Sequence, residues 1–263
     1  MSYVVSDVIV YPIKSLAGIQ TNQAKALKAG FEYDRRWMLL DKNNVFLTQR
    51  HLPQLALFIP EINSTNLSVR FNNESFSFAL NETTEVMIQT KVFDDQAETL
   101  MVSKDANEWF SDQLKIEIKL VKLKSEQSRI HHSSVKLIDI PVSLADGYPY
   151  LLAGTESLNH LNTKLEKSVP MNRFRPNIVV TTTVPHEEDM WDKVSIGTAI
   201  FKNIKPCGRC MIVTIDQSTG ISNKETLKIL NTYRKSGNSV LFGTNLMCTK
   251  EGVVSVGDPI FQD

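Results

Sequence analysis

The sequence has few cysteines, no excess of either charge and no long apolar run. Three cysteines among 263 residues cannot build a disulfide framework. Lysine plus arginine and aspartate plus glutamate number 29 each, so no global charge favours nucleic acid or an acidic membrane surface. The longest apolar runs fall well short of the ~20 residues that span a bilayer, and nothing before the first strand is typical of a signal peptide. We therefore expect a cytoplasmic protein that binds neither nucleic acid nor membrane.

The composition that is present belongs to an ordinary soluble globular protein. Apolar residues make up 42% and charged residues 22% of the chain. The length allows one large domain or two ordinary ones, with ample core. In the first half, short apolar runs alternate with polar residues, as in the "LSVRFNNESFSFAL" stretch, where "NNES" marks a turn. Runs of this kind at this spacing indicate a β-barrel or β-sandwich.

Helices and further strands are predicted around this β structure. The first segment ends as a strand at Pro12, and two apolar runs flank the "DKNN" turn at 41–44. Three helices are expected, with side-chain caps at their first residues. They span 105–114, capped by Asp105; 155–167, capped by Thr155; and 222–233, opened by Ser222 and Glu225. Strands are expected at 115–124, 177–184 and in the last 25 residues, and a long loop at 125–148. The fold class is mostly β with a few helices (α+β), divided near residue 124.

Two cysteines lie three residues apart in "KPCGRCMIVTIDQSTG", residues 205–220. A redox-active CxxC pair opens a helix, whereas Cys210 runs into "MIVTI", a β-branched run that predicts a strand. A structural zinc site needs four ligands, and no second closely spaced pair is present. Free cysteines are also common as small buried hydrophobic residues. Lys205 and Arg209 flank the pair, and nearby cations stabilise a thiolate, which binds soft metals.

Basic residues recur in loops beside the predicted strands. Arg175 precedes a proline, which biases its backbone toward an extended conformation, and an arginine in a rigid loop suits phosphate or carboxylate. Each arginine alone is typical of a solvated surface. Together with the thiols, these segments predict a pocket for an anionic cofactor held to a metal. They contain Lys14 and Ser15; Arg35 and Arg36; Arg50; and Arg173 and Arg175.

Several motifs together resemble a known family, the MOSC proteins with a MOSC N-terminal β-barrel. The motifs are "YPIKSLAG", "DRRWMLLD", "NRFRPNIVV", "KPCGRCMIVTIDQSTG" and "VGDPIF", and they cover essentially the whole chain in order. The family includes the mitochondrial amidoxime-reducing component and bacterial relatives. The resemblance implies an N-terminal β-barrel-like domain at residues 1–124, a MOSC β-barrel domain at residues 125–263, and the molybdenum cofactor (Mo-molybdopterin) between them.

The resemblance also implies roles for particular residues. Cys210 would be the protein thiolate on molybdenum, and Cys207 would be structural. The family's cofactor contacts map onto two groups of residues in this sequence. They are Lys14, Ser15 and Arg35 in the first domain, and Arg175 and Asn177 in the second, with Arg209, Thr155 and Ser157 as further assignments, the last two at a helix N-terminus suited to anions.

The activity implied by the resemblance is reduction of N-hydroxylated small molecules, such as amidoximes, hydroxylamines and N-hydroxylated bases. Many bacterial relatives carry a ferredoxin domain with four cysteines that this sequence does not contain. Electrons would then come from a separate protein of the ferredoxin, cytochrome or flavin reductase type. The alternative is a module that carries the cofactor or sulfur without turnover, as MOSC domains do in cofactor sulfurases. An inactive relative without cofactor is the third possibility.

Overall fold

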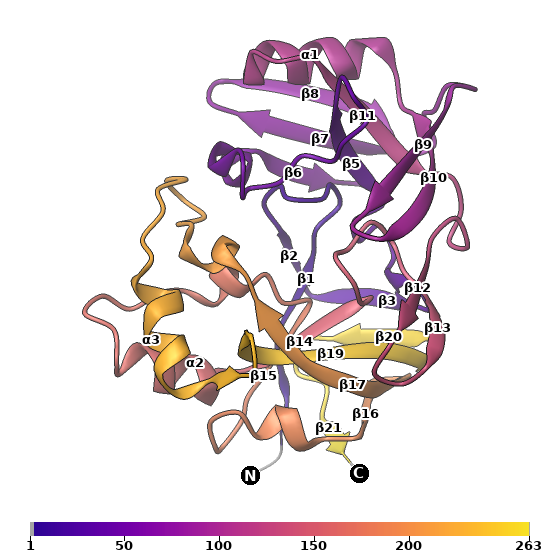
Figure 1. Cartoon of the computed structure of the whole chain (residues 1–263). Coiled ribbons are helices and arrows are strands. Elements are labelled where there is room, and N and C mark those ends of the chain that lie inside the picture. Colours follow the sequence, from indigo (N-terminus) through magenta and orange to yellow (C-terminus); the bar gives the residue numbers. More distant parts are fainter. Residues whose placement is uncertain (1–2, 263) are drawn as a thin grey trace.

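The computed structural model describes residues 3–262, and most of the regular structure is β (Figure 1). The largest sheet has nine strands and joins both ends of the chain. Its order is β2–β1–β15–β14–β19–β17–β16–β21, with β18 beside β19. Neighbours along this path are antiparallel except β14 and β15, which are parallel and are joined through α2. The strands are β1 (Val5–Val10), β2 (Ile19–Thr21), β14 (Tyr150–Gly154), β15 (Ile178–Val180), β16 (Lys193–Ile196), β17 (Ala199–Arg209), β18 (Lys235–Ser236), β19 (Ser239–Lys250) and β21 (Ile260–Gln262).

Residues 37–123 form two smaller sheets covered by a helix, in the upper half of Figure 1. The four-stranded sheet has the order β5–β11–β10–β9, and the three-stranded sheet has the order β6–β7–β8. Helix α1 packs on β11 and β8 and buries Ala106, Phe110 and Leu114. The elements are β5 (Trp37–Asp41), η1 (Pro53–Leu57), β6 (Ile59–Ile62), β7 (Asn66–Phe71), β8 (Glu74–Ala79), β9 (Met87–Val92), β10 (Asp95–Met101), α1 (Lys104–Leu114) and β11 (Ile118–Leu123).

Strand pairing crosses the predicted division near residue 124. Strand β1 pairs with β15, and β3 (Gln23–Leu27) pairs with both β4 (Gly30–Phe31) and β20 (Gly252–Ser255). Val5, Val8 and Val10 lie in the same core as residues of β14, β17 and β19. The first strands of the chain are therefore built into the C-terminal half, and the domain boundary itself stays a prediction.

The predicted mostly-β fold class is confirmed, and several local predictions need correction. The hairpin at 66–79 forms as expected. The predicted loop at 125–148 contains a hairpin of β12 (Ile130–Ser133) and β13 (Ile138–Pro141). Its residues carry no clear alternation of apolar and polar side chains, because the two strands bury only Ser133 and Ile140.

The helix starts also differ from the prediction. Ser103, not Asp105, caps α1, and its hydroxyl accepts a hydrogen bond from the Ala106 amide. Helix α2 is Thr155–Asn162, with Gly154 at its N-cap, and α3 is Glu225–Tyr233, with Lys224 there. Neither has a side-chain cap, because Thr155 Oγ1 accepts from the Thr182 amide and the Ser222 hydroxyl bonds Thr214. Among the described residues, no helix is both long and apolar enough to cross a membrane.

Candidate functional site

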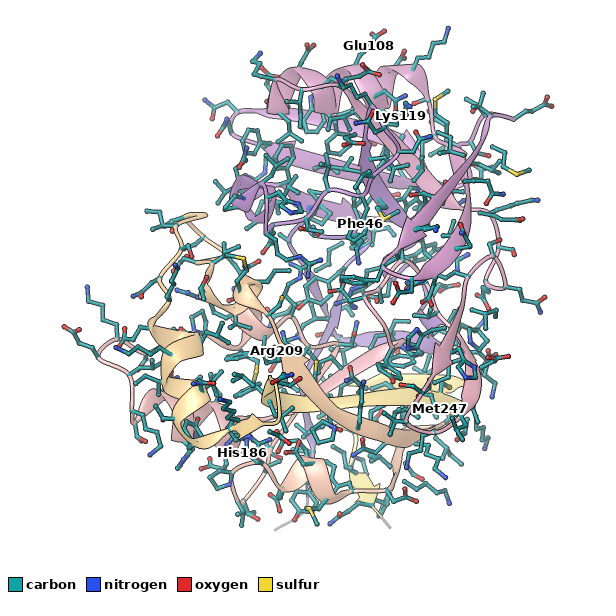
Figure 2. The ribbon with its side chains drawn as sticks, in the orientation of Figure 1. Phe46, Glu108, Lys119, His186, Arg209 and Met247 are labelled. Atoms are coloured by element: carbon teal, nitrogen blue, oxygen red, sulfur yellow. The ribbon has the colours of Figure 1, made fainter. Side chains whose placement is uncertain are left out.

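Cys210 directly follows β17, whose last residue, Arg209, lies near the centre of the molecule in Figure 2. The prediction of a strand after it is wrong: Met211–Thr214 is a single 3₁₀ turn, η4, which packs against α3. Arg173 explains the turn, because its guanidinium donates to the Thr214 carbonyl at 3.0 Å and to the Asp216 carboxylate at 2.9 Å. The buried Arg173 therefore fixes the backbone that follows the thiol.

The two thiols of the CxxC motif contact different arginines. Arg209 Nη1 lies 3.1 Å from Cys207 Sγ, and Arg50 Nη1 lies 3.8 Å from Cys210 Sγ. Both cysteines are free. Three residues of extended strand separate their Cα atoms by roughly 10 Å, beyond the ~7 Å that a disulfide allows. This geometry argues against a redox pair.

The remaining cysteine does not join them. Cys248 is buried in the large-sheet core, and burial raises the pKa of its thiol to about 11. Within residues 3–262, no group of three or more His, Cys, Asp and Glu side chains could hold a metal ion. A zinc site therefore has no support among the described side chains.

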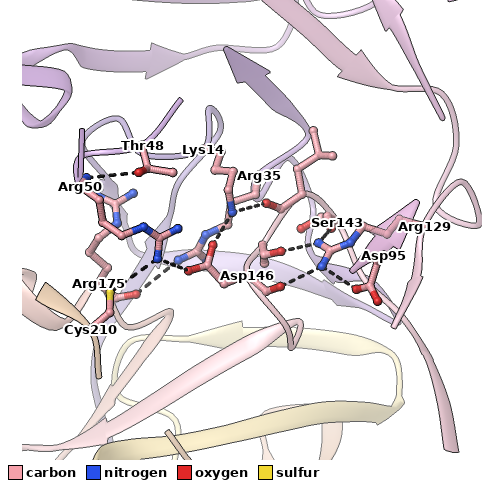
Figure 3. A network of polar contacts seen from close by, with 12 residues as sticks. Lys14, Arg35, Thr48, Arg50, Asp95, Arg129, Ser143, Asp146, Arg175 and Cys210 are labelled. Carbon is pink, nitrogen blue, oxygen red and sulfur yellow. Dashed lines mark hydrogen bonds and ion pairs between the residues drawn. The ribbon is translucent and has the colours of Figure 1, made fainter. Parts of the chain in front are cut away.

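Cations from both halves of the chain gather beside Cys210 (Figure 3). Lys14 follows β1, Arg35 lies in the turn before β5, and Arg175 follows the 3₁₀ turn η2 (Met171–Phe174). The guanidiniums of Arg35 and Arg175 lie over the Tyr11 ring, at 4.4 and 4.3 Å from its centroid. Arg35 Nη2 also donates to the Arg175 carbonyl at 3.4 Å. One aromatic ring and one backbone carbonyl therefore hold two like charges together.

Positive φ angles mark three of these residues. Ser15, Arg35 and Arg175 have φ values of 72°, 47° and 55°. The left-handed region is uncommon for residues other than glycine, and such backbone conformations concentrate at functional sites. The prediction that the residue before Pro176 is extended is therefore wrong for Arg175.

Two carboxylates partly balance the cations. Asp34 accepts from Arg35 Nη1 at 2.6 Å and is fully buried. Asp146, whose side chain is half exposed, pairs with Lys14 and lies 4.0 Å from Arg50. Lys14, Arg35, Arg50 and Arg175 thus face two carboxylates, which leaves a positive site beside the thiol.

Burial acts strongly on the charges of this site. It lowers the pKa of Lys14 to about 8, because Asp146 offsets only part of the desolvation. It also lowers the pKa of Arg175 to about 10. The pKa of Asp146 is about 2. Desolvation raises this pKa, but the opposite effect of the Lys14 ammonium and of Arg50 is larger. A cation buried in this way, as Lys14 is, is a strong binding partner for an anion.

The segment that carries Asp146 is fixed by a second buried arginine, Arg129, which is 1% exposed. Its guanidinium donates to the carbonyls of Ser143, Ala145 and Asp146 and pairs with Asp95 at 2.8 Å (Figure 3). Arg129 and Arg173 therefore position the two loops that meet at the site, without belonging to it.

The structure brings most of the predicted site residues together, in different ways. The Ser15 carbonyl accepts from Gln49 at 2.7 Å, and Gln49 in turn bonds Gln217, which Arg175 also contacts. Asn177 is buried, and its amide is committed within the protein, to Arg35, Asp34 and the Ile9 carbonyl. Asn177 therefore orients Arg35 and is not a free ligand here.

Thr155 and Ser157 lie elsewhere, at the start of α2. The carboxylate of Glu188 accepts from the Gly154 amide at 3.1 Å and from the Ser157 hydroxyl at 2.7 Å. A Cβ at Gly154 would lie 2.8 Å from that carboxylate. The anion that the helix N-terminus attracts is thus the protein's own Glu188. A cofactor role for Thr155 and Ser157 stays a prediction, with no contact to support it.

Sequence reasoning left four participants unassigned: Tyr11, Asp34, Arg50 and Asp146. Arg50 was noted as one basic residue among several, and only its contact with Cys210 singles it out. Asp146 lay in the predicted loop, so nothing placed it beside Lys14, which is 132 residues away in the chain. These pairings are long-range, and local patterns do not contain them.

The side chains present fit an anionic cofactor that brings its own metal ligands. Cys210 offers one soft donor, which suits a thiophilic metal, and the buried cations suit a phosphate. The Arg209 guanidinium contacts Cys207 Sγ at 3.1 Å and donates to the Phe174 carbonyl at 2.7 Å, so its assignment to the cofactor stays a prediction. A metal bound by Cys210 would need its other ligands from the bound group.

Comparison with known proteins agrees with this arrangement. Residues 2–117 match the MOSC N-terminal beta barrel domain, and residues 139–261 match the MOSC domain. The mitochondrial amidoxime reducing component 2 of Bos taurus is 31% identical, over 98% of this chain and 82% of its own length. The mitochondrial amidoxime-reducing component 1 is 29% identical in Danio rerio, over 98% and 84%, and 29% identical in Homo sapiens, over 98% and 82%. The chain therefore belongs to the MOSC proteins that carry a MOSC N-terminal β-barrel domain, the family of the mitochondrial amidoxime-reducing components.

Proposed function

We propose that this protein is an oxidoreductase that binds the molybdenum cofactor through Cys210 and reduces N-hydroxylated compounds such as amidoximes and hydroxylamines. The observation that carries the proposal is the free Cys210 thiol beside Arg50, at the edge of the cations Lys14, Arg35 and Arg175. The names of its relatives support reduction as the reaction class. The cytoplasm is proposed as its setting.

The chain's own residues bind and orient. Lys14, Arg35 and Arg175 would hold the phosphate of the cofactor, and charge-assisted contacts of this kind contribute about 1.5–3 kcal/mol each. Arg50, whose Nη1 lies 3.8 Å from Cys210 Sγ, would position this thiol, whose thiolate is the form that binds a metal. When bound, the cofactor supplies the two-electron oxygen-transfer chemistry. A separate electron-transfer protein, of the ferredoxin, cytochrome or flavin reductase type, would restore the electrons.

The test uses protein produced in a host that makes the cofactor. We expect molybdenum and pterin to copurify with wild type and with Cys207→Ala, and to be lost from Cys210→Ala. With reduced viologen as the electron donor, the loaded wild type should oxidise viologen when an amidoxime or hydroxylamine is added. Cys210→Ala should stay at the background rate.

Each contrary outcome points to one alternative. Metal retained by Cys210→Ala but lost from Cys207→Ala would mean that the ligand is the other thiol. Full molybdenum occupancy without turnover of any N-hydroxylated substrate would overturn the reductase proposal and favour the cofactor carrier.

A further inference from the structure

A cavity opens beside the "DRRW" segment, at residues other than those around Cys210. It measures about 210 Å³ and opens between β3–β4, the turn before β5, and β11. It is lined by Leu27, Ala29, Gly30, Phe31, Glu32, Tyr33, Arg36, Trp37, Leu80, Lys122 and Glu126. Neither thiol of the CxxC motif and none of the cations around Cys210 is among these residues.

Two cations line this cavity, and one of them lacks a partner. The Arg36 guanidinium makes no hydrogen bond or ion pair with residues 3–262, although it is only partly exposed. Burial lowers its pKa, which the nearby Glu126 partly offsets. Lys122 donates to the Leu80 carbonyl at 2.7 Å, and burial followed by repulsion from Arg36 lowers its pKa. An anion between the two cations would relieve both the desolvation and the repulsion.

Three of the lining side chains are aromatic: Phe31 and Trp37, each 1% exposed, and the partly exposed Tyr33. Trp37 and Lys122 are direct partners in the β5–β11 ladder, and the Lys122 ammonium lies 5.5 Å from the centroid of the Trp37 ring. Tyr33 stacks on Trp37 at 6.5 Å with an interplanar angle of 21°. The Tyr33 ring and the Arg36 guanidinium, both partly exposed, line the same cavity, and this pairing suits a ligand that joins an apolar body to a planar anionic head. A carboxylate is such a head, and Arg binds it in two-pronged geometry.

Two acidic side chains and the volume of the cavity limit which ligands could bind there. Glu32 and Glu126 also line the cavity, and their negative charges disfavour a dianion such as phosphate. The volume lies below the ~300 Å³ at which sites for drug-sized ligands begin. From this set of charges, rings and volume we infer a binding site for a small monocarboxylate with an apolar body. The site is separate from the proposed cofactor site, although Arg35 and Arg36 are adjacent in the chain.

Indole N–H signals in two-dimensional NMR test this inference at the cavity itself. The chain has three tryptophans, so Trp109→Phe and Trp191→Phe identify the signal of Trp37 by elimination. Benzoate, acetate and phosphate are titrated separately into wild type. We expect the Trp37 signal to shift and saturate with benzoate, and to respond at least fivefold more weakly to acetate and to phosphate.

Matched variants test whether the response to benzoate depends on Arg36. Arg36→Gln should weaken benzoate binding at least tenfold. Lys119→Gln is the control. Lys119, labelled in Figure 2, lies on β11 as Lys122 does, but its ammonium donates to the turn at residues 42–44 and does not line the cavity. An Arg175→Gln background weakens anion binding at the cofactor site and should leave the benzoate response unchanged. No saturable shift with benzoate, an equal affinity in Arg36→Gln, or tighter binding of phosphate would overturn the inference.

Discussion

At the scale of single residues, the charge of Lys14 changes close to neutral pH, because burial lowers its pKa to about 8. Its ammonium is buried, donates to the Leu144 carbonyl at 2.8 Å and pairs with Asp146. The family resemblance assigned Lys14 to the site, but nothing in "PIKS" indicated that it would be buried or paired. A local motif specifies residue types, whereas burial and partners depend on where the rest of the chain passes.

The depressed pKa of Lys14 predicts a pH-dependent affinity for anions. The folded-state pKa is about 8, so above that pH the free protein loses this charge. The same shift makes folding more favourable as the pH rises from about 8 toward 10.5, where only the unfolded chain holds the proton. We expect the affinity for sulfate, measured calorimetrically on cofactor-free protein, to fall about tenfold from pH 7 to pH 9.5.

Lys14→Met is the control for this pH dependence. It should bind sulfate weakly at every pH and show little change over the same range, because the titrating group is gone. A decline with pH as steep in Lys14→Met as in wild type would assign the effect to another group.

At the scale of elements, helix α1 shows where sequence patterns succeed and where they fail. The capping pattern at Asp105 predicted a helix in the right place, and Ala106, Phe110 and Leu114 form its one buried stripe. The cap was misplaced because Ser103 and Asp105 are both common N-cap residues. Their backbone conformations distinguish them: Ser103 is extended, whereas Asp105 lies within the helix.

This correction predicts unequal losses of stability. Ser103→Ala removes the hydroxyl that accepts from the Ala106 amide, and we expect the free energy of unfolding to fall by about 1 kcal/mol. Asp105→Asn removes only a charge in the first turn, which contributes about 0.3–1 kcal/mol. Denaturant unfolding measures both, and a clearly larger loss at Asp105 would return the cap to that residue.

The segment after Cys210 has the composition of a strand but forms the 3₁₀ turn η4. "MIVTI" is apolar and β-branched, which is typical of strands. Val213 and Thr214 are indeed buried, but in a 3₁₀ turn whose carbonyl is taken by Arg173. Tertiary contacts decided the conformation of these four residues, and Arg173 lies 41 residues away.

At the scale of the whole molecule, the first strand of the chain pairs with a strand of the C-terminal half. The fold class followed from alternation along the sequence, but the path of β1 could not, because nothing local says which strand it pairs with. Residues of β1 lie between β2 and β15, and the Asn177 amide and the Ile9 carbonyl join the two halves beside Arg35. The proposed cofactor site therefore depends on an N-terminal strand built into the C-terminal sheet.

This arrangement predicts that residues 125–263 do not fold alone. Without β1, the β15 edge is unpaired, and the core loses Val5, Val8 and Val10, which are 1%, 0% and 7% exposed. An exposed apolar edge of this kind is prone to aggregation. We expect the fragment to be insoluble, or to unfold without a cooperative transition followed by circular dichroism. Coexpression of residues 1–124 should restore a soluble complex, because β1 can then pair with β15. Cooperative unfolding of the isolated fragment would show instead that β1 contributes little to the C-terminal sheet, and that the two halves are independent domains.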